Sequence, residues 1–265
     1  MISPISNSST LSAIHQLFRN QNLLLQTMNR LATGRRINSG KDDPAGLISS
    51  ERLAADIRAL EAESRANQRV NSNANITEGH ASQLSAMYQD LHTLVLAGAN
   101  QAGMSDAEIA ANQMQIDNIV AGIGRFTEDA TASLDGLNLP NGGNAEIEAL
   151  YNSSYAAAAS VRSGGGNDLS SGNYAVALTA LERAIGDIAT SRGMVGTYQK
   201  DVLEPQYRSN QIAIENLTES RSRIVDTDYA VEISILAQAQ ILVKAGIMNL
   251  KIANQQAATV LQLLS

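Results

Sequence analysis

Residues 229–264 read YAVEISILAQAQILVKAGIMNLKIANQQAATVLQLL, and this stretch decides the fold class. Its aliphatic and small residues form two rows, each with a spacing of seven, and the second row follows the first by three residues. This is the a/d pattern of a coiled coil, in which one face of a helix packs against another helix. The first row comprises Leu236, Val243, Leu250, Ala257 and Leu264, and the second comprises Ala239, Gly246, Ala253 and Val260.

Additional apolar residues of the same segment lie outside the two rows. The helix is therefore nearly hydrophobic all round, which is typical of a helix buried on several sides. The small residues of the second row would let a neighbouring helix approach closely. The additional residues are Ile235, Ile241, Leu242, Ile247, Met248, Ile252, Leu261 and Leu263.

The opposite end of the chain carries a second heptad pattern, from about Thr10 to Ala32. A polar run, residues 33–41, follows as a connector, and Asp43 before Pro44 predicts the N-cap and first residue of the next helix. The two rows of the first segment are Ile14, Gln21 and Met28, and Leu17, Leu24 and Leu31, with Leu11, Phe18 and Leu25 widening the apolar stripe.

The middle of the chain is expected to be mostly helical. Apolar spacing and the absence of proline predict one helix from Pro44 to about Asn100, and a second, antiparallel helix over 109–126. Turn dipeptides and glycines in 132–173 predict loops with a short β-hairpin. Helical spacing returns over 174–192, breaks around residues 193–196, and continues to the end with Pro205 as the only proline.

Composition disfavours several classes of function. The 19 basic and 26 acidic residues are interspersed, which argues against binding to nucleic acid. There is no cysteine, and His15, His80 and His92 lack the spacing of a metal site. The residues therefore predict no enzyme, no metal and no cofactor. We expect no membrane insertion, because no uncharged window is long enough, and no cleaved signal peptide, because residues 1–11 lack its features.

Apolar heptads at both termini need more burial than one chain supplies. If the chain folds back on itself, its two terminal helices lie side by side, yet a pair of helices leaves most of a many-sided apolar surface in water. Copies of the same chain that meet through non-identical patches would cover that surface and build an open filament. An intramolecular coiled coil alone is the alternative.

Two motifs at opposite ends of the chain closely resemble the signatures of bacterial flagellin. Residues 29–47 read NRLATGRRINSGKDDPAGL, and residues 222–230 read SRIVDTDYA. The resemblance covers most of residues 10–135 and 174–265. It implies a structural subunit of the filament used for swimming, exported through the flagellar type III apparatus without signal cleavage. It also implies an extracellular location and three partners besides the homopolymer: an export chaperone, a filament cap and hook–filament junction proteins.

The resemblance implies a division into five segments. Residues 1–43 would form the amino-terminal inner-tube helix and elbow, 44–131 the shaft helices of the outer layer, and 132–173 a short region in place of variable outer domains. Residues 174–229 would form the carboxy-proximal shaft helix, and 230–265 the carboxy-terminal inner-tube helix. The fold expected is all-α: a long antiparallel coiled-coil helical bundle with a small loop or β-hairpin region, and terminal helices that pack between subunits.

Two groups of residues are the candidates for function. Assembly between subunits is assigned to Ile14, Leu17, Leu24, Met28, Leu31, Leu236, Val243, Leu250, Val260 and Leu264. The elbow is assigned to Arg35, Arg36, Asn38, Asp42 and Asp43. Arg35 and Arg36 either pair with carboxylates of a neighbouring subunit or remain solvated.

Two alternative functions stay open. A hook–filament junction protein resembles flagellin at both termini but would adapt rather than polymerise. A secreted translocator would insert helices into a host membrane, for which the sequence lacks an adequate apolar span.

Overall fold

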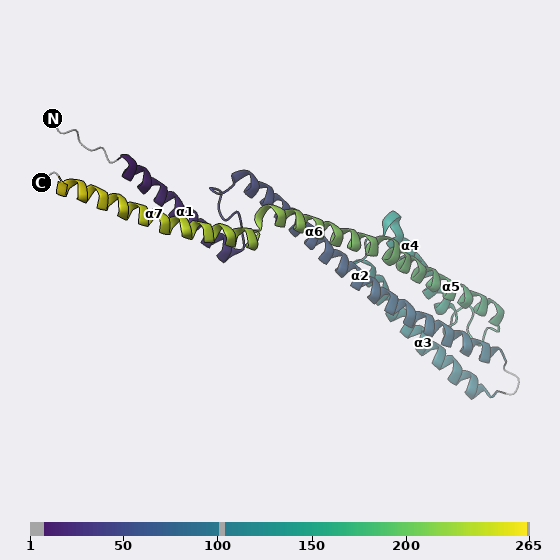
Figure 1. The fold of residues 1–265 in the computed structure, drawn as a ribbon. Coiled ribbons are helices and arrows are strands. Elements are labelled where there is room, and N and C mark those ends of the chain that lie inside the picture. Colours follow the sequence, from purple (N-terminus) through teal and green to yellow (C-terminus); the bar gives the residue numbers. More distant parts are fainter. Residues whose placement is uncertain (1–7, 101–103, 264–265) are drawn as a thin grey trace. The chain divides into compact units, whose positions relative to one another are not determined.

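The computed structural model describes residues 8–100 and 104–263, with side chains described for 11–100, 104–253 and 255. Within these residues the chain is helical with short connections (Figure 1). The helices are α1 (Ser8–Thr33), α2 (Pro44–Ala99), α3 (Asp106–Leu134), the 3-10 turn η1 (Pro140–Gly142), α4 (Gly143–Ser160), α5 (Tyr174–Tyr198), the π-helical turn η2 (Gln199–Leu203), α6 (Glu204–Val225) and α7 (Tyr229–Leu263).

The chain divides into two units. The terminal unit comprises Met1–Ala59 with Ala213–Ser265, and the bundle unit comprises Leu60–Ile212. Both α2 and α6 therefore contribute to each unit. The prediction of an all-α helical fold is confirmed.

The bundle unit contains the later part of α2, then α3, α4, α5 and the start of α6. Paired contacts give their directions. Thr77 of α2 shares a 2.8 Å hydrogen bond with Ser133 of α3, and the Cβ atom of an alanine at Gly122 of α3 would lie 2.6 Å from the Met87 methyl carbon of α2. As α2 advances, its partners in α3 move backwards, so the two helices are antiparallel. The absence of a side chain at Gly122 leaves room for the Met87 methyl group.

Side-chain contacts also place α4 and α5 in the bundle. Ser154 of α4 lies against the backbone of α5, since its hydroxyl is 3.4 Å from the Ala184 carbonyl oxygen. Arg192 of α5 donates from Nε and Nη2 to one carboxylate oxygen of Glu78 in α2, at 2.9 and 2.7 Å. This hydrogen-bonded pairing raises the pKa of Arg192. Fully buried side chains fill the centre, and the largest are Tyr88, Tyr151, Leu84, Leu91, Ile116, Ile123, Leu137, Ile147, Leu181 and Ile188.

The expected β-hairpin in residues 132–173 is wrong. Among the described residues the structure has no strand, only an isolated bridge between Arg35 and Asp226, and the centre of this region is the helix α4. The buried residues of α4 include Ile147, Tyr151, Ser154 and Ala158. Their spacing of four and three is helical, but two of them are small, so burial in the bundle rather than local hydrophobicity stabilises the helix.

The expected helix break at residues 193–196 is also wrong. Helix α5 continues through both glycines to Tyr198, because Ser191, Val195 and Tyr198 are buried in the bundle. The irregularity comes later, as the wide turn η2 directly before α6. Pro205 explains its position, since a proline lacks an N–H donor and its ring clashes with the carbonyl four residues earlier in a regular helix.

Candidate assembly surface on the terminal helices

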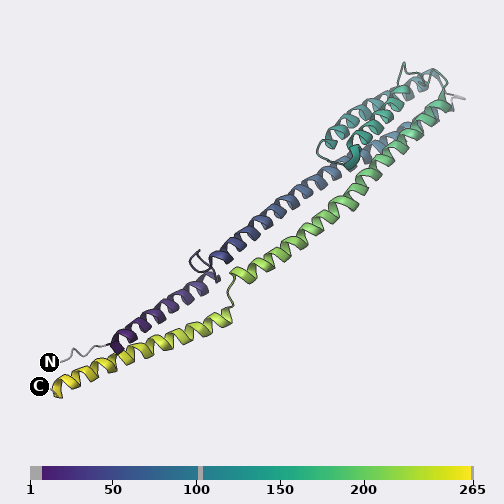
Figure 2. The same cartoon turned by 90° about the horizontal axis from the view of Figure 1, so that it is seen from above.

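Helices α1 and α7 of the terminal unit lie side by side (Figure 2). The Cβ atom of an alanine at Gly246 would lie 3.8 Å from the Leu17 Cβ atom, and an Arg30 guanidinium nitrogen lies 3.7 Å from a Glu232 carboxylate oxygen. Partners that advance along α1 therefore move backwards along α7, so the helices are antiparallel. We call the face along which they meet the seam.

The predicted assembly residues on α1 fall on or near the seam with one exception. Ile14, Leu17, Leu24 and Leu31 are half-buried. Met28 does not lie in the seam, because it is 52% exposed whereas its neighbour Thr27 is 0% exposed. Because the apolar stripe of α1 is wide, contact with α7 determines which of two adjacent residues is buried.

On α7, Leu236, Val243 and Leu250 are half-buried, and Ala239 of the second row is fully buried. Val260 lies within α7, but its side chain is outside the described set, and Leu264 lies outside the described residues. The two heptad rows of α7 are thus the face turned toward α1, as far as the side chains are described.

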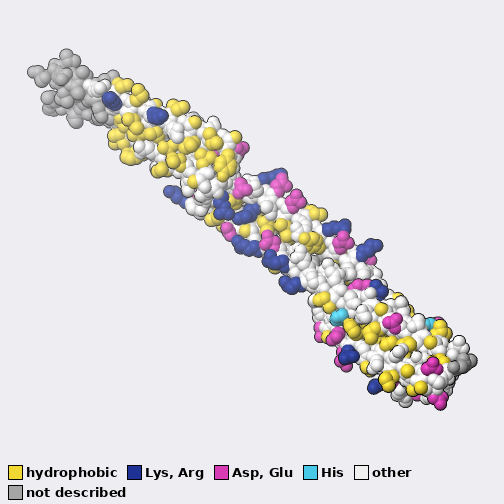
Figure 3. Space-filling view, turned by 90° about the horizontal axis from the view of Figure 1, so that it is seen from below, with side chains coloured by type: hydrophobic (Ala, Val, Ile, Leu, Met, Phe, Trp, Pro, Cys, Tyr) yellow, Lys and Arg dark blue, Asp and Glu magenta, His cyan; other side chains and the backbone are white. Residues whose placement is uncertain are grey.

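Many aliphatic side chains of both helices lie off the seam and are exposed. Figure 3 shows hydrophobic side chains gathered over this end of the terminal unit. Scattered exposed leucines are ordinary, but a contiguous apolar surface of this kind marks an interaction site. The exposed residues are Leu11, Phe18, Leu23, Leu25 and Met28 on α1, and Val231, Ile233, Ile241, Leu242, Ile247, Met248 and Ile252 on α7.

Backbone contacts tie the elbow, residues 34–43, to the segment between α6 and α7. The Arg36 N–H donates to the Val225 carbonyl at 2.6 Å, and the Thr227 N–H donates to the Gly34 carbonyl at 3.0 Å. Gly34 has φ of +69°, a left-handed conformation that favours glycine, and a Cβ atom there would also approach the Tyr229 hydroxyl at 2.9 Å.

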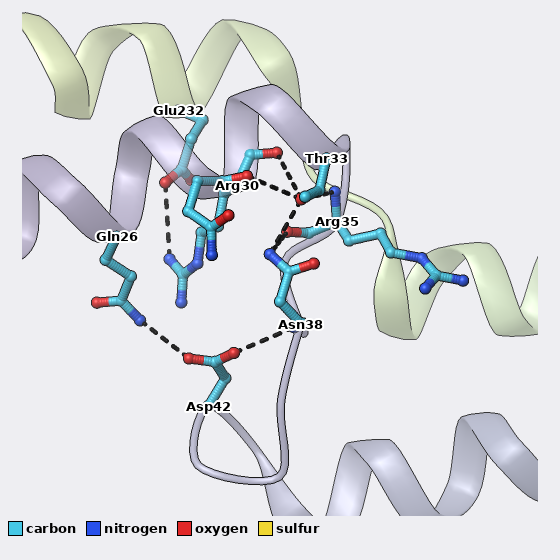
Figure 4. Close-up of polar contacts among 8 residues, drawn as sticks. Gln26, Arg30, Thr33, Arg35, Asn38, Asp42 and Glu232 are labelled. Carbon is cyan, nitrogen blue, oxygen red and sulfur yellow. Dashed lines mark hydrogen bonds and ion pairs between the residues drawn. The ribbon is translucent and has the colours of Figure 1, made fainter.

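The two elbow arginines differ. The Arg36 guanidinium donates to the Ile224 carbonyl of its own chain at 2.7 Å. Arg35 is exposed, and its side chain points away from the other labelled residues in Figure 4. The structure therefore gives Arg36 an intramolecular role as a contact between the elbow and the end of α6.

Asp42 organises the elbow loop. Its Oδ2 accepts from the Asn38 N–H at 3.1 Å (Figure 4). It also accepts from the Ser39 N–H and hydroxyl at 3.0 and 3.1 Å. These backbone hydrogen bonds, with a smaller effect of the Arg30 charge, lower the pKa of Asp42. The Asn38 amide in turn donates to the Thr33 hydroxyl at 3.0 Å. Asn38 and Asp42 thus shape the loop between α1 and α2.

Asp43 caps the next helix. Its Oδ1 accepts from the Gly46 N–H at 2.9 Å, and α2 begins at Pro44. Ile37 is buried beside Gly46, where the Cβ atom of an alanine would come within 2.7 Å of the Ile37 Cδ1 atom. The predicted Asp-Pro helix start is confirmed.

Two charged residues of the seam, Arg30 and Glu232, are not among the assembly residues predicted from the sequence. Glu232 is 5% exposed although it carries a carboxylate, and Arg30 lies opposite it. The sequence places Glu232 in the first turn of a helix, where negative charge is favourable. Its spacing of seven before Ala239 is the signal that could have placed it in the seam.

The described residues contain no group of three or more His, Asp or Glu side chains arranged to hold a metal ion. His80 lies edge-on to Phe126, and His92 lies 3.9 Å from Glu182, so the two do not share a site. A groove of about 600 Å³ in the bundle unit is open to solvent, and its lining includes Asn67, Asn71, Gln199, Lys200 and Tyr207.

One helix of the described chain, Tyr229–Ala253 within α7, is long and apolar enough to cross a membrane, contrary to the expectation from uncharged windows. Only 11% of its most apolar window is buried. The length, composition and exposure of this helix are compatible with insertion into a bilayer and with burial against a protein partner.

A two-helix seam that leaves apolar faces on both of its helices uncovered defines a class: a helical structural subunit that completes its burial by association. Family models agree. Residues 5–144 match the bacterial flagellin N-terminal helical region, and residues 178–264 match the bacterial flagellin C-terminal helical region. The chain belongs to the bacterial flagellin family, and it is a structural subunit of the flagellar filament.

Individual relatives support this assignment over nearly the whole chain. A flagellin of Bacillus subtilis is 29% identical over 97% of this chain and 98% of its own length. The flagellar filament 33 kDa core protein of Treponema phagedenis is 30% identical over 92% of this chain and 94% of its own. A flagellin of Salmonella rubislaw is 31% identical over 70% of this chain but only 39% of its own length. Nothing in these matches favours a hook–filament junction protein.

Proposed function

We propose that the chain builds the filament by burying the exposed faces of α1 and α7 against further copies of itself. The observation that carries the proposal is the row of uncovered aliphatic side chains on α7, exemplified by Ile241, which is 66% exposed. Burying one such side chain fully is worth about 1.5–3 kcal/mol, so several of them supply a large free energy of association.

We assign the predicted residues to two roles within this assembly. Leu17, Leu24, Leu31, Leu236, Val243 and Leu250, with Ile14, pair the two helices of one subunit along the seam. Met28, together with the exposed residues of α7, contacts neighbouring copies, and Val260 and Leu264 extend the apolar rows. Residues 1–43 and 230–265 form the inner tube, whereas 44–131 and 174–229 form the surrounding helical layer.

The proposed location is extracellular, in the flagellar filament, after export without a cleaved signal peptide. An export chaperone would cover apolar surface before assembly, and a filament cap and hook–filament junction proteins would bind the assembled ends. The chain acts as a structural protein without enzymatic activity or cofactor, and it binds no nucleic acid.

Membrane insertion of α7 is the competing use of its apolar surface. The candidate span contains Glu232, Lys244 and Lys251, and a charged side chain near the bilayer centre is costly. Its pairing with α1 along a heptad seam supports a protein partner instead. Leakage of dye from liposomes after addition of the purified chain would instead favour insertion.

The deciding experiment removes residues 230–265. We expect the bundle unit to remain helical by circular dichroism, because its core lies within Leu60–Ile212. We expect filaments to be absent from electron micrographs after seeding. Normal filaments from the truncated chain would overturn the proposal, and loss of helical signal from the bundle would show that the truncation acts through folding.

A further inference from the structure

The seam between α1 and α7 contains one ionic layer. Glu232 lies seven residues before Ala239 and fourteen before Gly246, so it occupies the row that is otherwise made of small residues. Its side chain is 6% exposed, and its carboxylate lies 3.7 Å from the guanidinium of Arg30, whose side chain is 23% exposed. A charged pair therefore stands in a seam whose other buried positions are uncharged, aliphatic or small on α7 and including the polar Thr27 on α1. Figure 4 shows the pair.

Because Glu232 is buried, its carboxylate needs an opposite charge on α1 nearby. A carboxylate that is removed from water is stable only when an opposite charge or hydrogen-bond donors accompany it, and removing one member of a buried pair is strongly destabilising. The buried side chain of Thr27 lies one turn from Arg30 on α1. The observed alignment places the Arg30 charge 3.7 Å from the Glu232 carboxylate, an ion pair longer than a hydrogen bond.

The aliphatic layers of the seam do not distinguish one heptad-related alignment from another, whereas the elbow hydrogen bonds of Gly34 and Arg36 hold this end of the seam in the same alignment as the ionic layer. Leu236, Val243 and Leu250 repeat every seven residues, as do Leu17, Leu24 and Leu31 on α1. A slide of seven residues would return leucines and small residues to equivalent layers. In one direction it would place the Glu232 carboxylate among aliphatic side chains near Leu24, and in the other it would move Glu232 past the end of α1, to the level of Asn38. A single polar layer in a coiled coil commonly sets register for this reason.

We propose that Arg30 and Glu232, here called the register pair, select one of the heptad-related alignments of α1 and α7. The pair thereby determines which exposed apolar side chains stand together on the surface of the terminal unit. The consequence for assembly rests on the proposed function, whereas the effect on register does not.

Disulfide trapping can measure register directly, because the chain has no cysteine of its own. At the aligned positions Leu17 and Gly246, the Cβ–Cβ distance would be 3.8 Å, within the range of about 3.5–4.5 Å that a disulfide requires. The double variant L17C/G246C reports the observed register. L17C/A239C and L17C/A253C report slides of one heptad in either direction.

The three reporters are compared in the full chain, polymerised on filament seeds, with and without Glu232→Ala. With Glu232 present, cross-linking of L17C/G246C should dominate. Glu232→Ala should raise the yield of a slipped reporter relative to L17C/G246C by about tenfold. The charge-swapped pair Arg30→Glu with Glu232→Arg should largely restore the original ratio, and Lys244→Ala, which removes an exposed charge from α7, should leave it unchanged.

The outcomes distinguish a failure of the register proposal from a failure of the proposed filament function. An unchanged ratio in the Glu232→Ala background would overturn the proposal, and so would loss of the L17C/G246C cross-link without any gain in a slipped reporter, which indicates general weakening. If Glu232→Ala blocks polymerisation, the ratio is read in the concentrated soluble protein by the same criteria. Correct cross-linking in a chain that never polymerises would count against the filament function and support the register pair.

Discussion

The bundle unit and the terminal unit contain the same types of aliphatic side chain, but these are buried in the bundle unit and largely exposed on the outer faces of the terminal unit. Leu84, Leu91 and Ile123 of the bundle are fully buried within one chain, whereas Ile241 and Ile247 of α7 are largely exposed. The difference lies in the number of helices around each side chain. Four helices enclose a core, whereas two helices cover only the face on which they meet. Hydrophobic content alone therefore does not distinguish a core buried within one chain, here called a private core, from apolar surface that is buried between chains.

The largest effect should come from the bundle core. Leu91→Ala removes a fully buried side chain and should lower the free energy of unfolding by about 2–5 kcal/mol. Chemical denaturation of the monomer, followed by circular dichroism at 222 nm, measures it. Leu96→Ala, an exposed position on the same helix, is the control and should change stability by less than about 0.5 kcal/mol. Equal effects at the two positions would contradict the assignment of a private core.

A substitution on α7 should show the reverse pattern. Ile241→Asn should leave monomer stability within about 0.5 kcal/mol, because the side chain is exposed. In the filament it should cost about 1.5–3 kcal/mol of burial, which raises the critical concentration for polymerisation by about tenfold to a hundredfold. Sedimentation of polymer at graded concentrations measures this, with Gln240→Asn as the control. An unchanged critical concentration would remove Ile241 from the assembly surface.

A smaller loss is expected at the N-terminus of α2, where the terminal unit has a stabilising contact of its own. Asp43→Ala removes the acceptor for the Gly46 N–H and should cost about 1 kcal/mol, within a range of about 0.5–2. Faster hydrogen exchange of the Gly46 amide reports the loss. Asp43→Ser retains a capping oxygen and should preserve most of the protection, so equal exchange in both variants would argue against capping.

The smallest effect should appear only in acid. The pKa of Asp42 is lowered from its ordinary value of 3.8, so its contribution to stability is present above that pH and is lost as the pH falls through the lower folded value. Protection of the Asn38 and Ser39 amides should therefore decrease in strong acid and stay constant near neutral pH. Asp42→Asn should remove this dependence, and a loss of protection between pH 5 and 7 would assign it to another group.

The sequence predicted the helical regions well where the apolar spacing is long and regular. The heptads of α7 correctly indicate the face that meets α1, and Asp43 with Pro44 correctly indicates the start of α2. The helix α4 was missed because Ser154 and Ala158, two of its buried positions, are small, and its flanks are rich in glycine and asparagine. Such a helix depends on neighbours that are distant in sequence.

Within the candidate site, the sequence placed residues on the correct helices but not always on the correct face. Met28 and Thr27 are adjacent, and only contact with α7 buries Thr27 and exposes Met28. Glu232 likewise satisfies the rule for the start of a helix, so its charge alone gave no reason to place it in the seam. Its burial depends on Arg30, which lies about two hundred residues away in the chain.

The sequence by itself determined that this protein is helical, that its terminal segments are heptad-patterned, and that it carries the motifs of flagellin at both ends. These properties follow from local spacing and residue type, which act within a few turns of helix. The tertiary structure decided which side chains are covered, how α1 and α7 align, and where a buried ion pair replaces an aliphatic layer. Those outcomes depend on contacts between distant segments, since burial is a property of the neighbours that surround a side chain.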